Sequence, residues 1–217
     1  MNREAKSEDW SAEHEQMVHV LRQYKIQDER VLAAMARVRR HIYIPARLRG
    51  SDAYGDHPNP IGYGQTISQP FIVAYMTQRM EVQPGKRILE IGTGSGYQAA
   101  VLAEMGAKVY SIEIVPELAD HARTVLAAEG YGAVQVKTGD GYKGWLEQAP
   151  FDAIIVTCAP ADIPQALVGQ LKDGGRMILP VGSAVQQLVV LERTGDTFLE
   201  IPDMYVRFVP MVKGRDD

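Results

Sequence analysis

The sequence has one cysteine among its 217 residues and no excess of basic charge, and both shortages exclude classes of protein. A single cysteine cannot build a disulfide framework or a cysteine-rich zinc site. With 23 basic and 27 acidic residues the net charge is −4, whereas generic polyanion binders are usually basic overall. No apolar run approaches the roughly 20 residues that span a bilayer, and the polar first ten residues do not form a secretory signal. We therefore expect a cytoplasmic protein without metal, membrane or nucleic-acid partners.

The spacing of apolar residues divides the chain into three stretches, of which the first is helical. Residues 11–54 have helical periodicity, with Asp28 as the predicted N-cap of a second helix and Pro45 ending the pattern. Glycine and proline crowd into residues 55–67, which predicts a loop. We expect residues 1–80 to form a helical and loop extension that packs on a core of residues 81–217, the two making one structural unit.

The second stretch, residues 68–182, alternates between short apolar runs and helical patterns. Strands are predicted at 87–91, 108–113, 134–138, 151–157 and 176–181, and helices at 97–105, 116–129 and 163–171. This alternation is typical of an α/β fold with a doubly wound, mostly parallel sheet. In the third stretch, strands are predicted at 188–193 and 205–211, and a turn at 194–196 follows the first of them. We expect these strands to be antiparallel and to lie at one edge of the sheet.

A glycine-rich turn follows the first predicted strand and opens a helix. Its glycines, Gly92, Gly94 and Gly96, have the spacing G-x-G-x-G, and Tyr97 stands where a dinucleotide site would have glycine. The turn also lacks the Lys-Ser/Thr pair of a phosphate-binding P-loop. Glycines here let the backbone turn tightly and approach a ligand, but neither a dinucleotide nor a nucleoside triphosphate is favoured.

Acidic residues mark the ends of successive predicted strands. Glu90 precedes the glycines, and Glu113 ends the second strand, where a carboxylate can accept hydrogen bonds from a ribose diol. Asp140, between two glycines after the third strand, could bind an exocyclic amine of a purine. Taken alone, Glu113 could be a solvated strand end and Asp140 could be a turn residue between two glycines. Together they predict a nucleoside pocket without pyrophosphate, which S-adenosylmethionine (SAM) fits.

With these motifs the chain resembles the class I SAM-dependent methyltransferases and, more narrowly, the bacterial protein-L-isoaspartate O-methyltransferases. The resemblance covers roughly residues 15–214 and rests on residues 61–70, 92–96, 139–141, 174–182 and 206–210. It implies a seven-stranded Rossmann-like sheet and methylation of the free α-carboxylate of L-isoaspartyl residues in damaged peptides and proteins, which starts their repair. The implied SAM-binding residues are Ile67, Ser68, Gly92, Thr93, Gly94, Gly96, Glu113, Asp140 and Gly141.

Ser68 is the catalytic residue that the resemblance implies, with Thr66 and Ser68 contacting the substrate. From the residues alone, Ser68 is also a plausible N-cap of the helix that Pro70 opens. A carboxylate with a reference pKa near 4 is already ionised at pH 7, so the reaction needs no general base. We therefore expect Ser68 to orient the acceptor by a hydrogen bond and to form no covalent intermediate.

Other conspicuous residues receive no functional role. His14 and His19 are five residues apart, which is not the spacing of a zinc protease motif. Cys158 is expected to be a small buried hydrophobe. The basic cluster Arg37, Arg39, Arg40, Arg47 and Arg49 is expected to be solvated rather than to bind RNA.

Two alternative functions stay open at this point: a class I methyltransferase acting on a small molecule or RNA, and a non-catalytic SAM-binding sensor. Val212 stands where animal members of the family carry a hydroxyl residue, so the contribution of the last strand to the pocket is open. No motif specifies an oligomer, and a monomer is expected.

Overall fold

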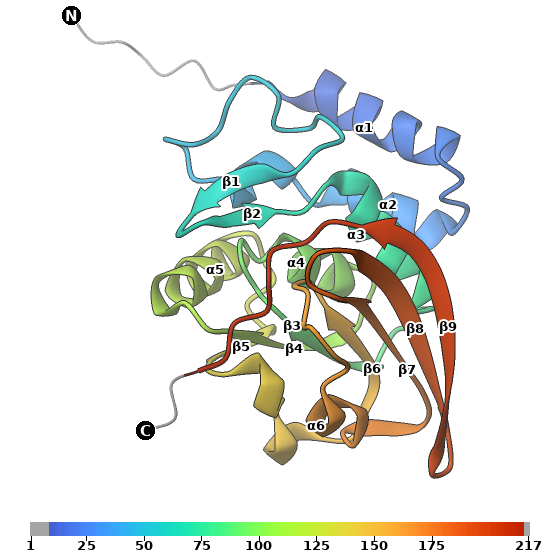
Figure 1. Ribbon diagram of the computed structural model, residues 1–217. Helices are drawn as coiled ribbons and strands as arrows, with labels where there is room; N and C mark the ends of the chain where they lie inside the picture. The colour runs from blue at the N-terminus through green and yellow to red at the C-terminus, as the bar shows by residue number, and fades with distance from the viewer. Residues whose placement is uncertain (1–8, 215–217) are drawn as a thin grey trace, which may run out of the picture.

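A seven-stranded sheet forms the centre of the computed structural model, which describes residues 9–214 (Figure 1). Its spatial order is β5-β4-β3-β6-β7-β8-β9. The first five of these strands are parallel, and β8 and β9 are antiparallel additions at one edge. The predicted fold class is thereby confirmed. The strands are β3 (Arg87–Ile91), β4 (Lys108–Glu113), β5 (Gln135–Thr138), β6 (Phe151–Val156), β7 (Leu171–Val181), β8 (Gln186–Thr194) and β9 (Thr197–Val206).

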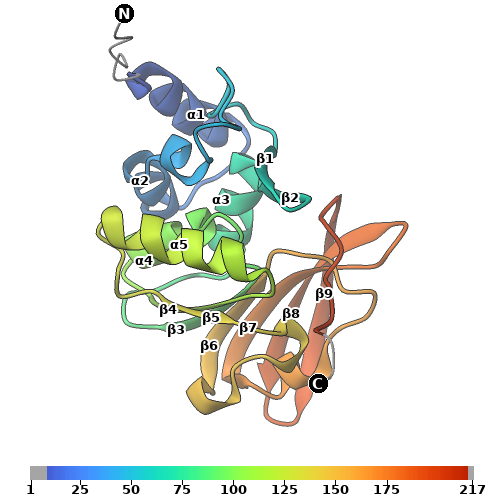
Figure 2. The same ribbon diagram turned by 90° about the vertical axis from the view of Figure 1, so that its left-hand side faces the viewer.

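The two faces of the sheet are covered unequally. Within residues 9–214, five helices lie on the side of one face, with the first two in chain order stacked on the others, and a single short helix with two 3-10 turns covers the other face (Figures 1 and 2). The five are α1 (Ser11–Gln23), α2 (Glu29–Arg37), α3 (Pro70–Arg79), α4 (Tyr97–Glu104) and α5 (Pro116–Ala128). The opposite face has α6 (Gln165–Val168), η2 (Gly141–Lys143) and η3 (Leu146–Gln148), while η1 (Arg40–Tyr43) follows α2.

Alternating side chains of the central strands build two hydrophobic clusters. On β3, Ile88 packs into the cluster under the helices, whereas Leu89 and Ile91 belong to the opposite cluster. This follows from the two-residue period of a strand, which sends successive side chains to opposite faces. The larger cluster also includes Leu21 and Met35 from α1 and α2, so the N-terminal stretch and the sheet share one core.

Capping at the N-terminal side agrees with the prediction for Asp28. Its carboxylate oxygen accepts hydrogen bonds from the backbone N–H groups of Arg30 (2.9 Å) and Val31 (3.4 Å) at the start of α2. This satisfies two of the free donors that every helix start exposes. Two further N–H groups, of Gln27 and Asp28, donate to the side chain of Gln78 on α3, which fixes the α1–α2 corner on that helix.

The predicted loop over residues 55–67 is partly wrong, because it contains a small antiparallel hairpin. Its strands are β1 (Asn59–Gly62) and β2 (Gln65–Ile67). The turn between them has three residues with positive φ, Gly62, Tyr63 and Gly64. Two of the three are glycines, which adopt this conformation without strain. The glycines that suggested an irregular loop therefore make a hairpin turn instead.

Three other predicted boundaries need correction in the C-terminal half. The helix predicted at 163–171 is only the four residues of α6, and Leu171 already begins β7. β7 is longer than predicted because it continues through Gly174 and Gly175, whose register against β6 shifts. The last strand, predicted at 205–211, ends at Val206, and Pro210 makes only an isolated bridge with Ala159.

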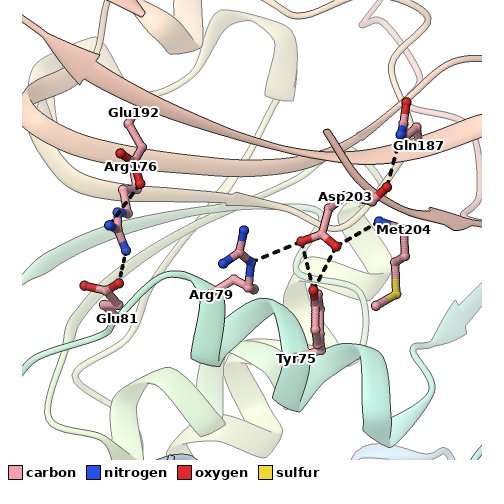
Figure 3. Close-up of polar contacts among 8 residues, drawn as sticks. All are labelled: Tyr75, Arg79, Glu81, Arg176, Gln187, Glu192, Asp203 and Met204. Atoms are coloured by element: carbon pink, nitrogen blue, oxygen red, sulfur yellow. Dashed lines mark hydrogen bonds and ion pairs between the residues drawn. The ribbon is translucent and has the colours of Figure 1, made fainter. Parts of the chain in front are cut away.

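Two polar clusters attach α3 and the loop after it to the antiparallel edge (Figure 3). In the first, the Asp203 carboxylate on β9 accepts hydrogen bonds from the Tyr75 hydroxyl (2.8 Å) and from Arg79 Nε (3.1 Å). In the second, Arg176 on β7 is ion-paired with Glu192 on β8 (2.9 Å) and with Glu81. Because α3 begins beside Ser68 and β9 ends before residue 207, the first cluster connects the two segments that flank the site described next.

Candidate functional site

A cleft opens at the carboxyl ends of β3, β4 and β6. Chain order reverses between β3 and β6, and such a switch point is where open parallel sheets bind ligands. The hairpin β1–β2 and the segment after β9 lie side by side at the cleft (Figures 1 and 2). The lining residues are Gln65, Thr66, Ile67, Ser68, Ile91, Gly92, Thr93, Gly94, Ser95, Tyr97, Gln98, Ile112, Glu113, Ile114, Gly141, Thr157, Cys158, Val209, Pro210, Met211 and Val212.

The glycine turn lies at the floor of the cleft, and its backbone requires glycine. Gly92, Gly94 and Gly96 all have positive φ, at 93°, 52° and 86°. Gly92 and Gly94 line the cleft, whereas Gly96 begins α4 from behind the turn, where an added Cβ would press on Leu126 at 3.3 Å. Gly92 and Gly94 therefore present backbone to the cleft, and Gly96 allows the start of α4 to pack closely on α5.

Glu113 faces this turn from the end of β4 and is almost fully buried. Its two carboxylate oxygens accept the backbone N–H groups of Gly94 (2.8 Å) and Val115 (2.9 Å). These bonds hold the carboxylate in one orientation while lone pairs of both oxygens stay available. Among the described lining residues it is the only aspartate or glutamate, and no lysine, arginine or histidine accompanies it.

Glu90 lies behind the glycine turn and is linked to it through two hydroxyl groups. Ser111, its partner in the β3–β4 register, donates to Glu90 Oε2 at 2.5 Å, and the hydroxyls of Ser111 and Thr93 are 2.5 Å apart. Burial raises the pKa of the Glu90 carboxyl to about 8, and the negative charge of Glu113 adds to this rise. Glu90 is therefore protonated at neutral pH and supports the turn from beneath without lining the cleft.

The hairpin side of the cleft brings Thr66, Ile67 and Ser68 together, as the sequence predicts for the substrate side. The predicted capping role of Ser68 is wrong, because the N-cap residue of α3 is Gln69. The Gln69 side chain makes no capping hydrogen bond to the helix either. The Asp56 carboxylate instead accepts the N–H of Phe71 (2.9 Å) and the side-chain amide of Gln69 (2.8 Å). The Ser68 hydroxyl is thus not required for the helix start.

The segment after β9 supplies a further part of the lining, with Val209, Pro210, Met211 and Val212. Ala159 holds it by two backbone hydrogen bonds of 2.8 Å, one to the Val209 carbonyl and one from the Met211 N–H. The side-chain amide of Gln186 bonds both backbone groups of Phe208. The sequence leaves the contribution of this segment open, and the short family match at residues 206–210 is its only signal there.

Of the two predicted site residues after the third strand, Gly141 lines the cleft and Asp140 does not. A Cβ at Gly141 would collide with the side chain of Ile91. The Asp140 carboxylate lies just outside the lining and accepts the N–H of Tyr142 at 2.8 Å, which caps η2. Its predicted contact with a purine amine therefore stays a prediction, with a second, structural role beside it.

The predicted solvation of the arginine cluster is wrong for Arg40, and Arg49 is only half-exposed. Arg37 and Arg39 are exposed and ion-paired with Glu104 (3.0 Å) and Glu129 (2.9 Å), but Arg40 is fully buried. The sequence does not reveal the burial of Arg40, because arginine side chains are mostly exposed. Cys158 is a free cysteine that lines the cleft, and burial raises the pKa of its thiol to about 12.

Within residues 9–214 no helix is long and apolar enough to cross a membrane. No group of three or more potential metal-ligating side chains is found in the same residues.

A parallel sheet with a glycine turn at its switch point, an acid at the next strand end and a third strand end at Gly141 defines a SAM-dependent methyltransferase of class I. Comparison with known proteins agrees. The family model for protein-L-isoaspartate (D-aspartate) O-methyltransferase matches residues 12–216. A protein-L-isoaspartate O-methyltransferase of Gloeobacter violaceus is 54% identical over 198 residues, covering 89% of this chain and 95% of the relative. One of Methanoculleus marisnigri is 50% identical and covers 92% and 91%.

Solved structures of the same description share the fold. One protein-L-isoaspartate O-methyltransferase superposes with a TM-score of 0.83 at 27% identity; the match covers 91% of this chain and 65% of that one. A Plasmodium falciparum protein described as a protein-L-isoaspartate O-methyltransferase, in complex with S-adenosyl-L-homocysteine (SAH), gives 0.82 at 25% identity and covers 93% and 99%.

The chain belongs to the protein-L-isoaspartate (D-aspartate) O-methyltransferase family. The predicted family, the methyltransferase activity on isoaspartyl residues and the cofactor SAM are confirmed. The roles of individual site residues are taken up below as proposals.

Proposed function

We propose that the cleft holds SAM against the strand ends and the isoaspartyl carboxylate between Ser68 and the segment at residues 209–212. The observation that carries this assignment is the division of the lining into two parts. The glycine turn and the one carboxylate of the lining, Glu113, lie at the strand ends, whereas residues 65–68 and 209–212 line the cleft without any charged side chain.

The sheet side fits a nucleoside with an amino-acid tail. Glu113 presents an oriented carboxylate that can accept ribose hydroxyl groups. The turn at Gly92, Thr93 and Gly94 presents backbone to the cleft where the amino-acid tail would lie, and a Cβ added at Gly94 would meet only Ile61, at 3.5 Å. Gly141, with Asp140 beside it, lies at the place predicted for the purine. The turn lacks the Lys-Ser/Thr pair of a phosphate-binding loop, which agrees with a cofactor that has no phosphate.

The hairpin side fits an acceptor that is already ionised. When bound, SAM supplies a positively charged sulfonium whose methyl group is transferred to a nucleophile. The Ser68 hydroxyl can donate a hydrogen bond to one oxygen of the acceptor carboxylate, and Thr66 and Ile67 bound the same space. Ser68 thereby directs the second oxygen toward the methyl group. Positioning of this kind can supply roughly 7–11 kcal/mol in favourable cases.

The lining favours a reaction without a general base or a covalent intermediate. A carboxylate needs no deprotonation at pH 7, and no histidine, lysine or arginine is among the described lining residues. Cys158, the one thiol, is neutral at physiological pH because of its raised pKa. An anion and a cation neutralise each other in the transition state, and apolar residues such as Ile67, Pro210 and Val212 favour this over separated charges in water.

The test of the proposed function is transfer of labelled methyl from SAM to an isoaspartyl peptide, with the same peptide containing normal aspartate as the matched control. We expect incorporation into the first peptide only, as a base-labile ester. Equal labelling of both peptides, or binding of SAM with no turnover, would contradict the proposal.

Ser68→Ala tests the assignment of the catalytic residue. We expect kcat to fall about 10- to 100-fold, the range for a lost positioning contact, while the Kd for SAH measured by calorimetry stays unchanged. Because the hydroxyl does not cap α3, the thermal unfolding midpoint should change little. A variant with wild-type kcat would remove Ser68 from the mechanism.

We further infer a monomer in the cytoplasm that does not bind nucleic acid. The ion pairs of Arg37 and Arg39 with glutamates, and the burial of Arg40, remove three of the five clustered arginines from a basic surface. Light scattering at the mass of one chain would support the first point.

A further inference from the structure

Arg40 is a fully buried cation that the mechanism above does not use. Its exposed fraction is 0%, and among the described residues it forms no ion pair, although the negative charge of Asp56 acts on it. A buried charge normally has an ionic partner, because removal from water is costly. Burial does lower the pKa of Arg40, to about 10, so the guanidinium still carries its charge at neutral pH. A charge kept under these conditions requires an explanation.

The guanidinium is satisfied instead by backbone carbonyl groups from three places in the chain. Arg40 Nε donates to the Ala53 carbonyl (2.9 Å), Nη1 to the Ser68 carbonyl (2.8 Å) and Nη2 to the His57 carbonyl (3.3 Å). These donors lie in a fixed planar fork, so they set the three carbonyls relative to one another. The residue thus joins η1, the loop before the hairpin and the segment that contains Ser68.

The same group also lies against the wall of the cleft. Its central carbon is 5.2 Å from the centroid of the Tyr97 ring, which is a favourable cation–π distance. Tyr97 is the first residue of α4 and lines the cleft directly after the glycine turn. The Arg40 guanidinium therefore contacts the Ser68 backbone and also lies against the ring of Tyr97 at the cleft.

The loop that Arg40 holds is bonded a second time to the start of α3. Asp56, between Ala53 and His57, accepts from Gln69 and Phe71. Residues 53–57 and 68–71 are thus clamped from both directions, once by the Arg40 guanidinium and once by the Asp56 carboxylate. Ser68 lies inside this double clamp, and its backbone has little freedom to move.

We propose that Arg40 is a positioning residue for methyl transfer, which holds the Ser68 backbone so that the hydroxyl stands at the correct distance from the glycine turn. This inference rests on the proposed role of Ser68. Three convergent donors in one plane are needed for it, so the compact ammonium of lysine cannot replace the guanidinium.

The first experiment compares Arg40→Lys with Arg39→Lys. We expect Arg40→Lys to lower kcat for the isoaspartyl peptide about 10- to 100-fold, because a displacement near 1 Å at a reacting group can have that effect, with the Kd for SAH unchanged. Arg39 is the matched control, an adjacent arginine whose side chain is 58% exposed and pairs with Glu129 on the surface. Its substitution should leave both constants unchanged. Equal kcat in Arg40→Lys and wild type would overturn the proposal.

A double-mutant cycle separates this proposal from the role of Ser68 itself. If Arg40 acts through Ser68, Arg40→Lys should reduce kcat much less in the Ser68→Ala background than in the wild type. If Ser68→Ala has full activity, the proposed function of Ser68 is wrong. If Ser68→Ala loses activity and the two losses multiply, Ser68 keeps its role and Arg40 does not act through it.

A measurement on the unmodified enzyme covers the case in which Arg40→Lys does not fold. The guanidinium protons of Arg40 should be resolved by nitrogen-15 NMR and should exchange with solvent at least about 100-fold more slowly than those of Arg39, because local opening is required first. Equal exchange of the two arginines would contradict the geometry on which the proposal stands.

Discussion

The two walls of the cleft are held in place by different means. The wall that we propose for the cofactor, called the cofactor wall, consists of strand ends, and its contacts join neighbours in the sheet, such as Glu113 to Gly94 and Ser111 to Glu90. The wall that we propose for the acceptor, called the acceptor wall, consists of residues 65–68 and 209–212 and belongs to no strand of the large sheet. It is held by contacts from distant parts of the chain, chiefly those of Arg40, Gln186 and Ala159.

This difference separates two kinds of requirement. A nucleoside cofactor of constant shape can be bound by backbone at fixed strand ends, and a few glycines with positive φ are sufficient. An acceptor residue within a variable polypeptide needs a wall that side chains can adjust. We therefore expect substitutions on the first wall to change cofactor affinity and those around the second to change acceptor kinetics.

The largest expected effect comes from Gly94→Val on the cofactor wall. A β-branched residue is strained at a φ of 52°, and its side chain would occupy the open space beside the turn. We expect the Kd for SAH to rise at least about 100-fold, a rise that a few kcal/mol of strain and exclusion would produce.

The matched control is Gly130→Val, because Gly130 also has positive φ, 88°, and nothing lies within 4 Å of an added Cβ. It should lose stability but retain cofactor affinity. Unchanged SAH affinity in Gly94→Val would remove the glycine turn from the cofactor site and end the comparison of the walls.

A smaller effect is expected from Asp203→Asn, which weakens the link between α3 and β9 (Figure 3). Because α3 follows Ser68 and β9 precedes residues 209–212, a looser link should widen the acceptor side. We expect KM for the isoaspartyl peptide to rise about 3- to 10-fold, the range of one or two weakened hydrogen bonds to a charged group, with SAH affinity constant.

Glu192→Gln is the control in the same part of the structure, since it weakens the second cluster through Arg176, which does not border the cleft. It should leave KM unchanged. Equal changes in both variants would mean that general loosening of the sheet edge, not the acceptor wall, sets KM.

A further expected effect concerns pH and the support of the glycine turn, and it acts on stability rather than on ligand binding. The pKa of Glu90 is about 8 in the folded protein and near 4 in an unfolded chain. Between these values the folded state binds one proton more, so the free energy of unfolding falls as pH rises, by up to about 1.4 kcal/mol per pH unit. Glu90→Gln should abolish this part of the pH dependence between pH 5 and 8.

Urea unfolding of wild type and variant at several pH values measures it. Ser68→Ala, on the acceptor wall, should keep the wild-type dependence. Parallel curves for the wild type and Glu90→Gln would show that Glu90 is ionised in the folded state.

Much of the cofactor wall could be predicted from the sequence because its determinants are local. Apolar runs of five or six residues fix the strands, and glycines directly after one of them fix the turn. Glu113 and Gly141 then follow from being at the ends of the next parallel strands, since such ends meet at one edge. The helix predicted at 163–171 is wrong because that prediction also used only the local pattern, which does not reveal the long β7 that begins at Leu171.

The sequence by itself determined the family, the parallel sheet and the glycine turn, because these depend on residue type and spacing along a short stretch of chain. Only the tertiary structure decided that residues 59–67 form a hairpin, that Asp56 rather than Ser68 caps α3, and that Arg40 is buried. The physical reason is that burial of a charged side chain depends on which distant carbonyl groups fold around it. Nothing in the residues beside Arg40 distinguishes it from Arg39, which remains in solvent.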